Sequence, residues 1–301
     1  MRYILILLLL CIGCSDRAHE AGAPKQLLTH HIFIAHLAEE LTERTPVEVS
    51  SPADDYTTIE TLAEELRTKK EWIAGKAPHS DAVITLARLI PEDQLFTHVR
   101  RHNLHAVEID ISRSYYEGAP SPAVLRDTAG SANPYIWLSP QNILAMAYTL
   151  QRDLKRLYPA YAETISQNFQ SFRQEMRALQ RTFGTKYAQL ARFETALMDP
   201  AYAYLAEDIN LFITHRFPHE SDWDSADSSR FITGLTAGEF SLVMHRWNPG
   251  GTIDSLCTAH GVSLITPPLG VPAAEGFQNG IIPFYEHLYK SVYTGLKGQT
   301  Q

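Results

Sequence analysis

A continuous apolar stripe runs through the middle of the chain and predicts a long helix there. Its members follow one another at intervals of three or four residues, which places them on one helical face. They are Tyr161, Ile165, Phe169, Phe172, Met176, Leu179 and Phe183. Ser139 and Pro140 provide a helix start before the stripe, and Pro159 predicts a kink or a break. We therefore expect a helical connector over residues 139–183.

Short apolar strands alternate with helices on both sides of this connector. Before it, strands are expected at residues 27–28, 47–49, 81–86 and 105–111, with helices at 30–41, at 57–70 and from 91. After it, strands are expected at 195–198, 211–213, 240–244 and 262–266, with helices at 201–207 and 283–296; residues 215–230 are expected to be polar and irregular. This alternation is typical of parallel sheets covered by helices. The expected fold class is α/β, with two parallel-sheet lobes joined by a long rigid connector helix.

The first residues have the pattern of an export signal for a lipoprotein. A basic start is followed by an apolar run that ends at Gly13, directly before Cys14. The run is too short to cross a membrane, which takes about 20 residues. We expect a signal peptide at 1–13, a lipid on Cys14 and a tether over 14–25. The N-terminal lobe then spans 26–138, the connector 139–183 and the C-terminal lobe 184–301.

Composition excludes several classes of protein. The net charge of −8 comes without a basic stripe, so no nucleic-acid partner is expected. Cys257 is the only cysteine after the signal besides Cys14, which excludes an internal disulfide and a CxxC zinc site. The chain also lacks a nucleophile elbow, a phosphate-binding loop and a His-Glu-x-x-His motif, so we do not expect an enzyme.

The stretch from Asn133 to Pro140, which reads NPYIWLSP, resembles a signature of one receptor family. That family is the cluster A-I group, the TroA- or ZnuA-like periplasmic metal receptors of ABC transporters. Two later segments fit in order, the region around Asn168 and the run DPAYAYLA that begins at Asp199. The resemblance implies a periplasmic monomer that binds a metal ion between its lobes, and the lipid expected on Cys14 would anchor it to a membrane. It also implies delivery of that ion to an ABC permease in the inner membrane.

The family's usual ligands, three histidines and a carboxylate, are not retained in this chain. The first histidine position falls at Tyr56, with Asp55 beside it. The second falls at Tyr135 and the third at Asp199, while the carboxylate position falls at Pro267. The expected cargo is a divalent or ferric ion, and other residues must therefore account for how this chain would bind it.

Three interpretations remain open. In the first, Tyr56, Tyr135 and Asp199, with help from Asp55, hold a hard cation such as ferric iron, because phenolate and carboxylate are hard donors. In the second, a histidine outside the family positions holds zinc or a similar ion. In the third, a degenerate receptor has lost the metal and serves as a sensor, a scaffold or a binder of another solute. The histidines available are His30, His31, His36, His215, His219, His245 and His260.

His30 and His31 are the possible metal ligands that we single out from this set. They directly follow the first predicted strand. The carboxyl ends of parallel strands are where α/β clefts bind their ligands.

Overall fold

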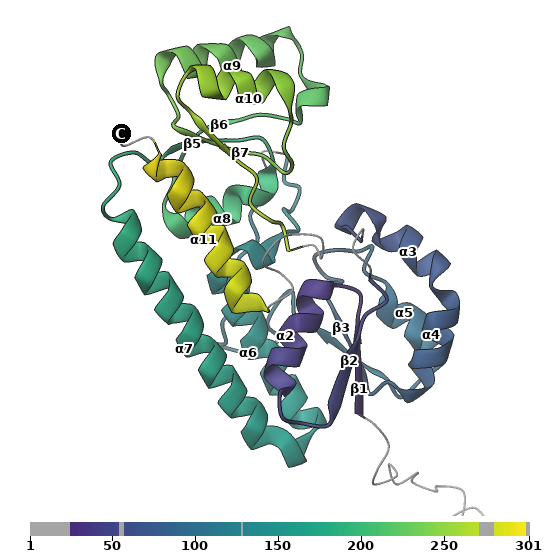
Figure 1. Cartoon of the computed structure of the whole chain (residues 1–301). Helices are drawn as coiled ribbons and strands as arrows, with labels where there is room; N and C mark the ends of the chain where they lie inside the picture. Colours follow the sequence, from purple (N-terminus) through teal and green to yellow (C-terminus); the bar gives the residue numbers. More distant parts are fainter. Residues whose placement is uncertain (1–24, 54–56, 128, 271–279, 299–301) are drawn as a thin grey trace, which may run out of the picture.

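The computed structural model describes residues 25–53, 57–127, 129–270 and 280–298, and these residues form two lobes on a helical spine (Figure 1). Each lobe contains one four-stranded parallel sheet. The N-terminal sheet has the order β2-β1-β3-β4, and the C-terminal sheet has the order β6-β5-β7-β8. The predicted fold class is confirmed.

The strands are short, and most of their side chains are buried. In the N-terminal sheet they are β1 (Lys25–Thr29), β2 (Val47–Ser50), β3 (Ala82–Thr85) and β4 (Val107–Asp110). In the C-terminal sheet they are β5 (Glu194–Leu197), β6 (Phe212–Arg216), β7 (Leu242–Met244) and β8 (Ser263–Ile265). Parallel pairing brings the carboxyl ends of all strands in one sheet to the same edge, so residues just after them can share a site.

Two helices, rather than one, form the spine. α6 (Pro140–Leu157) begins with Ser139, whose hydroxyl accepts a hydrogen bond from the Asn142 N–H at 3.3 Å. A short 3₁₀ turn at Pro159–Tyr161 follows, and α7 (Ala162–Tyr187) then runs back along α6. The break falls where proline removes a backbone donor.

Shorter helices cover the sheets. The N-terminal lobe has α2 (Ile32–Thr42), α3 (Leu62–Thr68), α4 (Lys70–Lys76) and α5 (Leu95–Arg100). The C-terminal lobe has α8 (Ala203–Ile209), α9 (Ser225–Ala237) and α10 (Gly251–Ala259). The last helix, α11 (Ile281–Lys297), lies beside α7 and also contacts α2. None of the described helices is long and apolar enough to cross a membrane.

The expectation of an irregular segment over 215–230 is wrong. β6 continues to Arg216, and α9 begins at Ser225. The Asp224 carboxylate caps α9 by accepting hydrogen bonds from two backbone N–H groups, at 2.7 and 2.9 Å. This cap starts the helix although its first turn is polar. The helix expected from residue 91 begins later, at Leu95.

Candidate functional site

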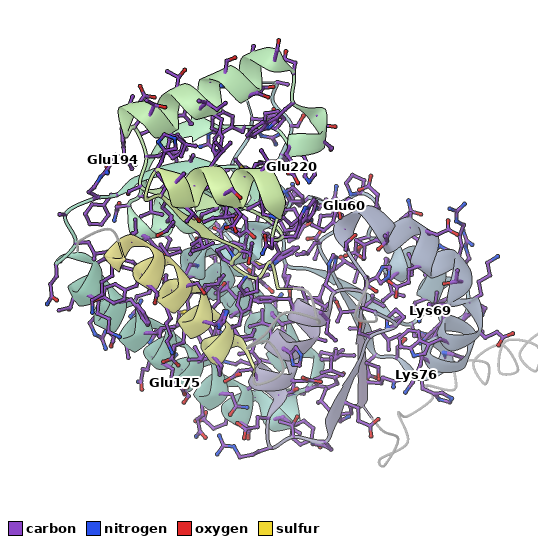
Figure 2. All side chains as sticks on the ribbon, turned by 45° about the horizontal axis from the view of Figure 1, so that its top comes forward. Glu60, Lys69, Lys76, Glu175, Glu194 and Glu220 are labelled. Carbon is purple, nitrogen blue, oxygen red and sulfur yellow. The ribbon has the colours of Figure 1, made fainter. Side chains whose placement is uncertain are left out.

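Four side chains from both lobes converge where the lobes face each other, and we call them the seam cluster. They are Glu60, Tyr135, Asp199 and Arg246. Figure 2 shows Glu60 on the side of the N-terminal lobe that faces the C-terminal lobe. A hollow of about 1260 Å³ opens beside the cluster, and both Glu60 and Arg246 line it. The cluster therefore lies between the lobes, where the family resemblance predicts the metal site.

Local structure fixes each member of the seam cluster. Glu60 lies in a 3₁₀ turn that precedes α3, and Tyr135 lies in the turn that leads into the spine. Asp199 follows β5, and its Oδ1 accepts the Ala201 N–H at 2.7 Å, which leaves Oδ2 facing the seam. Arg246 lies two residues after the end of β7. The cluster thus draws on the carboxyl ends of two neighbouring strands.

A guanidinium group occupies the point of convergence. Arg246 donates to Glu60 Oε1 at 3.2 Å and also contacts the Tyr135 hydroxyl, and its Nε lies 3.7 Å from Asp199 Oδ2. The Tyr135 hydroxyl in turn donates to Glu60 Oε1 at 3.1 Å. The two carboxylates offset the single positive charge without an ion from outside. Arg246 therefore supplies the cation at this position.

Burial keeps the phenol of Tyr135 neutral. The side chain is only 7% exposed, and this burial raises its pKa well above the usual value, an effect that Glu60 reinforces and Arg246 opposes. Burial also acts to raise the pKa of Glu60, but backbone and Thr58 hydrogen bonds and the Arg246 charge hold that pKa below its usual value. The cluster therefore combines a neutral phenol with an ionised Glu60. For Tyr135 to bind a metal ion as a phenolate, the Arg246 side chain would have to move away from its hydroxyl.

The structure places only some of the predicted site residues at the seam. Tyr135 and Asp199 lie there and share a partner, as an inter-lobe site requires. Pro267 lines the hollow, and its carbonyl accepts the Tyr202 hydroxyl at 2.5 Å. Asp55, Tyr56 and Cys14 lie outside the described residues.

His30 and His31 are buried in the N-terminal lobe and are already paired with carboxylates. His30 Nε2 lies 2.8 Å from Glu65, and His31 Nε2 lies 3.1 Å from Asp93. Burial opposes ionisation of Asp93, yet His31 and the Leu86 N–H lower its pKa. Each histidine therefore belongs to a local pair, and their role as metal ligands stays a prediction.

A second cluster lies in the C-terminal lobe, and we call it the His–Glu–His trio. His219 and Glu220 are adjacent in the chain after β6, and His245 directly follows β7. Each of the three offers one ligand atom, and all three atoms lie within 4.8 Å of one another. Among the described residues, no other group of three histidine, cysteine or acidic side chains meets this criterion.

Sequence reasoning missed Arg246 and did not assemble the trio. His219 and His245 were candidates one by one, but 26 positions separate them and nothing local links them. The available signal was their position after predicted strands, because strands of one parallel sheet end at a common edge. The same signal applies to Arg246, which directly follows His245.

Comparison with known proteins gives consistent results. The sequence model of the family described as "ZnuA: Zinc-uptake complex component A periplasmic" matches residues 34–247. The iron-binding protein YfeA of Yersinia pestis is 26% identical over 113 residues, a stretch that covers 36% of this chain and 36% of YfeA.

Solved structures with this fold match over nearly the whole length. A crystal structure of ZnuA superposes with a TM-score of 0.65 at 16% identity, covering 90% of this chain and 98% of ZnuA. A mutant of FpvC from Pseudomonas aeruginosa superposes with a TM-score of 0.68 at 16% identity, covering 92% of this chain and 99% of FpvC. At such low identity these likenesses support the shared fold alone.

Proposed function

Because this chain belongs to the ZnuA family of periplasmic zinc-uptake components, we propose that it is the extracytoplasmic receptor of a metal-importing ABC transporter. The family consists of metal-binding receptors that work with ABC permeases, and its members are not enzymes. The observation that carries the proposal is the convergence of side chains from both lobes beside the inter-lobe hollow. Delivery to a permease requires such a site to open and close.

The proposed cargo is a transition metal ion of the zinc, manganese or iron type. The matched family takes its name from zinc uptake, and the partial relative YfeA is an iron-binding protein. At the seam, Tyr135 and Asp199 would offer oxygen donors, which suit hard cations such as ferric iron. Tyr56 and Asp55, which lie outside the described residues, stay proposed ligands on the family resemblance alone. This version requires Arg246 to swing away.

We further propose that the receptor is lipid-anchored through Cys14. The apolar run that ends at Gly13 supports export, and the cysteine after it offers a thiol for acylation. An anchor of this kind raises the effective concentration of the receptor near its permease. Mass spectrometry of the membrane-extracted protein tests it, because a Cys14→Ser variant should lose the lipid mass.

The seam also favours a second candidate function. A guanidinium already pairs with Glu60 and Asp199 at the position where the resemblance places the metal. In this alternative the receptor binds no metal at the seam and serves as a sensor, a scaffold or a binder of another solute. The experiment below separates the two candidates.

The test is elemental analysis of the protein purified without chelator, followed by thermal unfolding with zinc, manganese, copper and ferric ions. A cargo ion present at a hundred times its Kd should stabilise the fold by about 2.7 kcal/mol. A ferric charge-transfer band that is absent in Tyr135→Phe would place the ion at the seam. No bound metal and no stabilisation by any ion would favour the second candidate.

A further inference from the structure

We infer that the His–Glu–His trio is a metal site of its own, separate from the seam, for a borderline divalent ion such as zinc. The site stands on its own geometry, and only its use for cargo rests on the proposed function. Its ligands are His219, Glu220 and His245, all from the C-terminal lobe. None of the three falls at a family ligand position.

The spacing of the donor atoms fits a small divalent ion. His245 Nε2 lies 2.7 Å from Glu220 Oε2, and His219 Nε2 lies 3.3 Å from the same oxygen. Zinc binds nitrogen and oxygen at about 2.0–2.2 Å in tetrahedral geometry, so its ligand atoms stand roughly 3.4 Å apart. Only small side-chain movements would be needed to admit the ion. Two imidazoles and one carboxylate are also ligands that zinc accepts readily.

Burial supports a built site rather than a chance surface cluster. The His245 side chain is 0% exposed, Glu220 is 25% exposed and His219 is 31% exposed. The Nε2 atom of His219 is itself buried, and although it lies 3.3 Å from Glu220 Oε2, it makes no hydrogen bond of good geometry within the described structure. Buried polar atoms nearly always have partners, so this nitrogen calls for one. A metal ion held between it and Glu220 supplies that partner.

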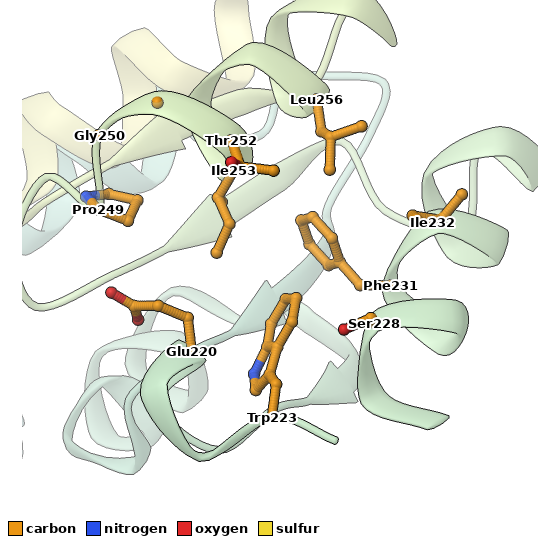
Figure 3. Close-up of a pocket in the computed structure, with 11 residues that line it drawn as sticks. Glu220, Trp223, Ser228, Phe231, Ile232, Pro249, Gly250, Thr252, Ile253 and Leu256 are labelled. Carbon is orange, nitrogen blue, oxygen red and sulfur yellow. The ribbon is translucent and has the colours of Figure 1, made fainter. Parts of the chain in front are cut away.

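An ion held by the three trio ligands would have a fourth coordination position, and there is open space beside the trio for a further ligand. Glu220 borders a second hollow, of about 480 Å³, between α9 and α10. Figure 3 shows the Glu220 carboxylate beside Pro249, with Trp223 and Ile253 on the apolar walls. Zinc sites with three protein ligands keep a fourth position for water or another ligand. An open position suits an ion that has to be released again.

Metal binding through Nε2 requires the proton of each histidine ring to lie on Nδ1. In the metal-free form, His245 Nδ1 accepts the Trp247 N–H at 3.1 Å, so the proton of a neutral ring lies on Nε2. An imidazole that binds metal through Nε2 carries its proton on Nδ1 instead. Metal binding therefore turns the Trp247 amide away from the ring. At His219, Nδ1 accepts the Ser221 backbone N–H at 3.2 Å, so this amide must also turn away, and the Ser221 hydroxyl, 2.7 Å from Nδ1, can then accept a hydrogen bond from the protonated Nδ1.

The test compares zinc and cobalt(II) binding by isothermal titration and by the visible spectrum of cobalt. The variants are His219→Ala, Glu220→Gln and His245→Gln, and the control is His260→Ala, an exposed histidine in the same lobe. We expect each trio variant to weaken zinc binding at least about tenfold, because each removes a direct ligand. The control should bind like the wild type. Since His219 and Glu220 are partly exposed, their variants should fold even if His245→Gln does not.

The outcomes separate this inference from the proposed function. If Tyr135→Phe weakens binding while the trio variants bind like the wild type, the ion lies at the seam. The trio is then overturned and the receptor function stands. If the wild type binds none of the ions offered, both the trio and the metal-receptor function are overturned. Cobalt spectra without the bands of tetrahedral histidine ligation would also contradict the trio.

Discussion

At the scale of single residues, Arg246 decides what the seam can bind. Its guanidinium contacts Tyr135, Glu60 and Asp199, which would otherwise present oxygen atoms to a common point. Oxygen donors of this kind favour hard cations. The arginine therefore competes with any metal for the oxygen atoms of the proposed seam site.

Replacing Arg246 with alanine should create a site for a hard cation at the seam. At an effective dielectric constant of 20, a positive charge 4 Å from a bound cation repels it by about 4 kcal/mol. Removing the guanidinium removes this repulsion. We expect terbium affinity to rise at least about tenfold, which corresponds to about 1.4 kcal/mol. Terbium luminescence excited through the nearby Tyr135 and Trp137 measures it. Arg246→Lys, which keeps the charge, should show no gain, and equal emission from both variants would contradict the idea.

Gly270 is a second residue with a specific role, because the chain passes close to Trp137 there. Its φ is +82°, and an added Cβ would lie 2.9 Å from Trp137 Nε1 and 3.0 Å from Phe33. The Trp137 indole N–H donates to the Leu269 carbonyl at 2.8 Å. Gly270→Ala should therefore cost about 2–4 kcal/mol of unfolding free energy, from backbone strain and crowding together.

Urea unfolding measures this loss, and Gly130→Ala is the matched control. Gly130 has a similar φ of +87°, but no heavy atom lies within 4 Å of an added Cβ. The control should show the cost of backbone strain alone, about 1–3 kcal/mol. Equal losses in the two variants would mean that contact with Trp137 contributes nothing.

At the scale of elements, α11 packs on α7 and α8 around a carboxyl group. Asp208 on α8 accepts hydrogen bonds from Tyr289 on α11 and from Gln180 on α7. Burial raises the pKa of Asp208 above its usual value, although these hydrogen bonds oppose the shift. The folded protein therefore loses stability as pH rises from the ordinary carboxyl pKa toward the raised one.

Asp208→Asn should remove this pH-dependent loss. Below about pH 4, where the carboxyl is protonated in both the folded and the unfolded state, we expect variant and wild type to differ least. Near pH 7 the variant should be more stable relative to the wild type than it is at low pH. Its amide accepts the Tyr289 hydrogen bond without carrying a charge. Urea unfolding at the two pH values measures the change. Glu207→Gln, on an exposed neighbour, should give no such pH dependence.

Most elements could be predicted because their patterns are local. The spine follows from its apolar stripe and Pro159, and the strands follow from short apolar runs. α9 was missed because its first turn is polar, although Asp224 and Gly238 stand at its ends as capping residues. At the site, the signature around Trp137 pointed to Tyr135, and the later run DPAYAYLA pointed to Asp199. Arg246 could not be found this way, because its partners come from three distant segments that only the fold brings together.

At the scale of the whole molecule, one apolar core links the N-terminal lobe, the spine and part of the C-terminal lobe. It extends from Leu27 on β1 to Leu296 on α11. The last helix closes this core: Tyr285 donates to the Trp137 carbonyl, and Tyr187 donates to the Tyr289 carbonyl at 2.6 Å. The two lobes therefore share this core, and each also has a smaller core of its own, around Phe231 in the C-terminal lobe and around Val83 in the N-terminal lobe.

A shared core predicts a single cooperative unfolding transition. Tryptophan fluorescence and far-ultraviolet circular dichroism should give the same urea midpoint, because Trp72 and Trp137 lie in the N-terminal lobe and Trp223 and Trp247 in the C-terminal lobe. Variants that cut into the shared core, such as Phe172→Ala, should shift both signals together by about 3–5 kcal/mol. Two separated midpoints would show that the lobes unfold independently.

His245 and Arg246 are consecutive residues, and this adjacency joins two sites that otherwise share no ligand. An ion that turns the Trp247 amide also pulls on the arginine between them, whose side chain reaches across to the opposite lobe. If both the trio and the proposed receptor function hold, the loaded molecule presents a different outer face from the empty one, and a transport partner can distinguish the two without touching the ion.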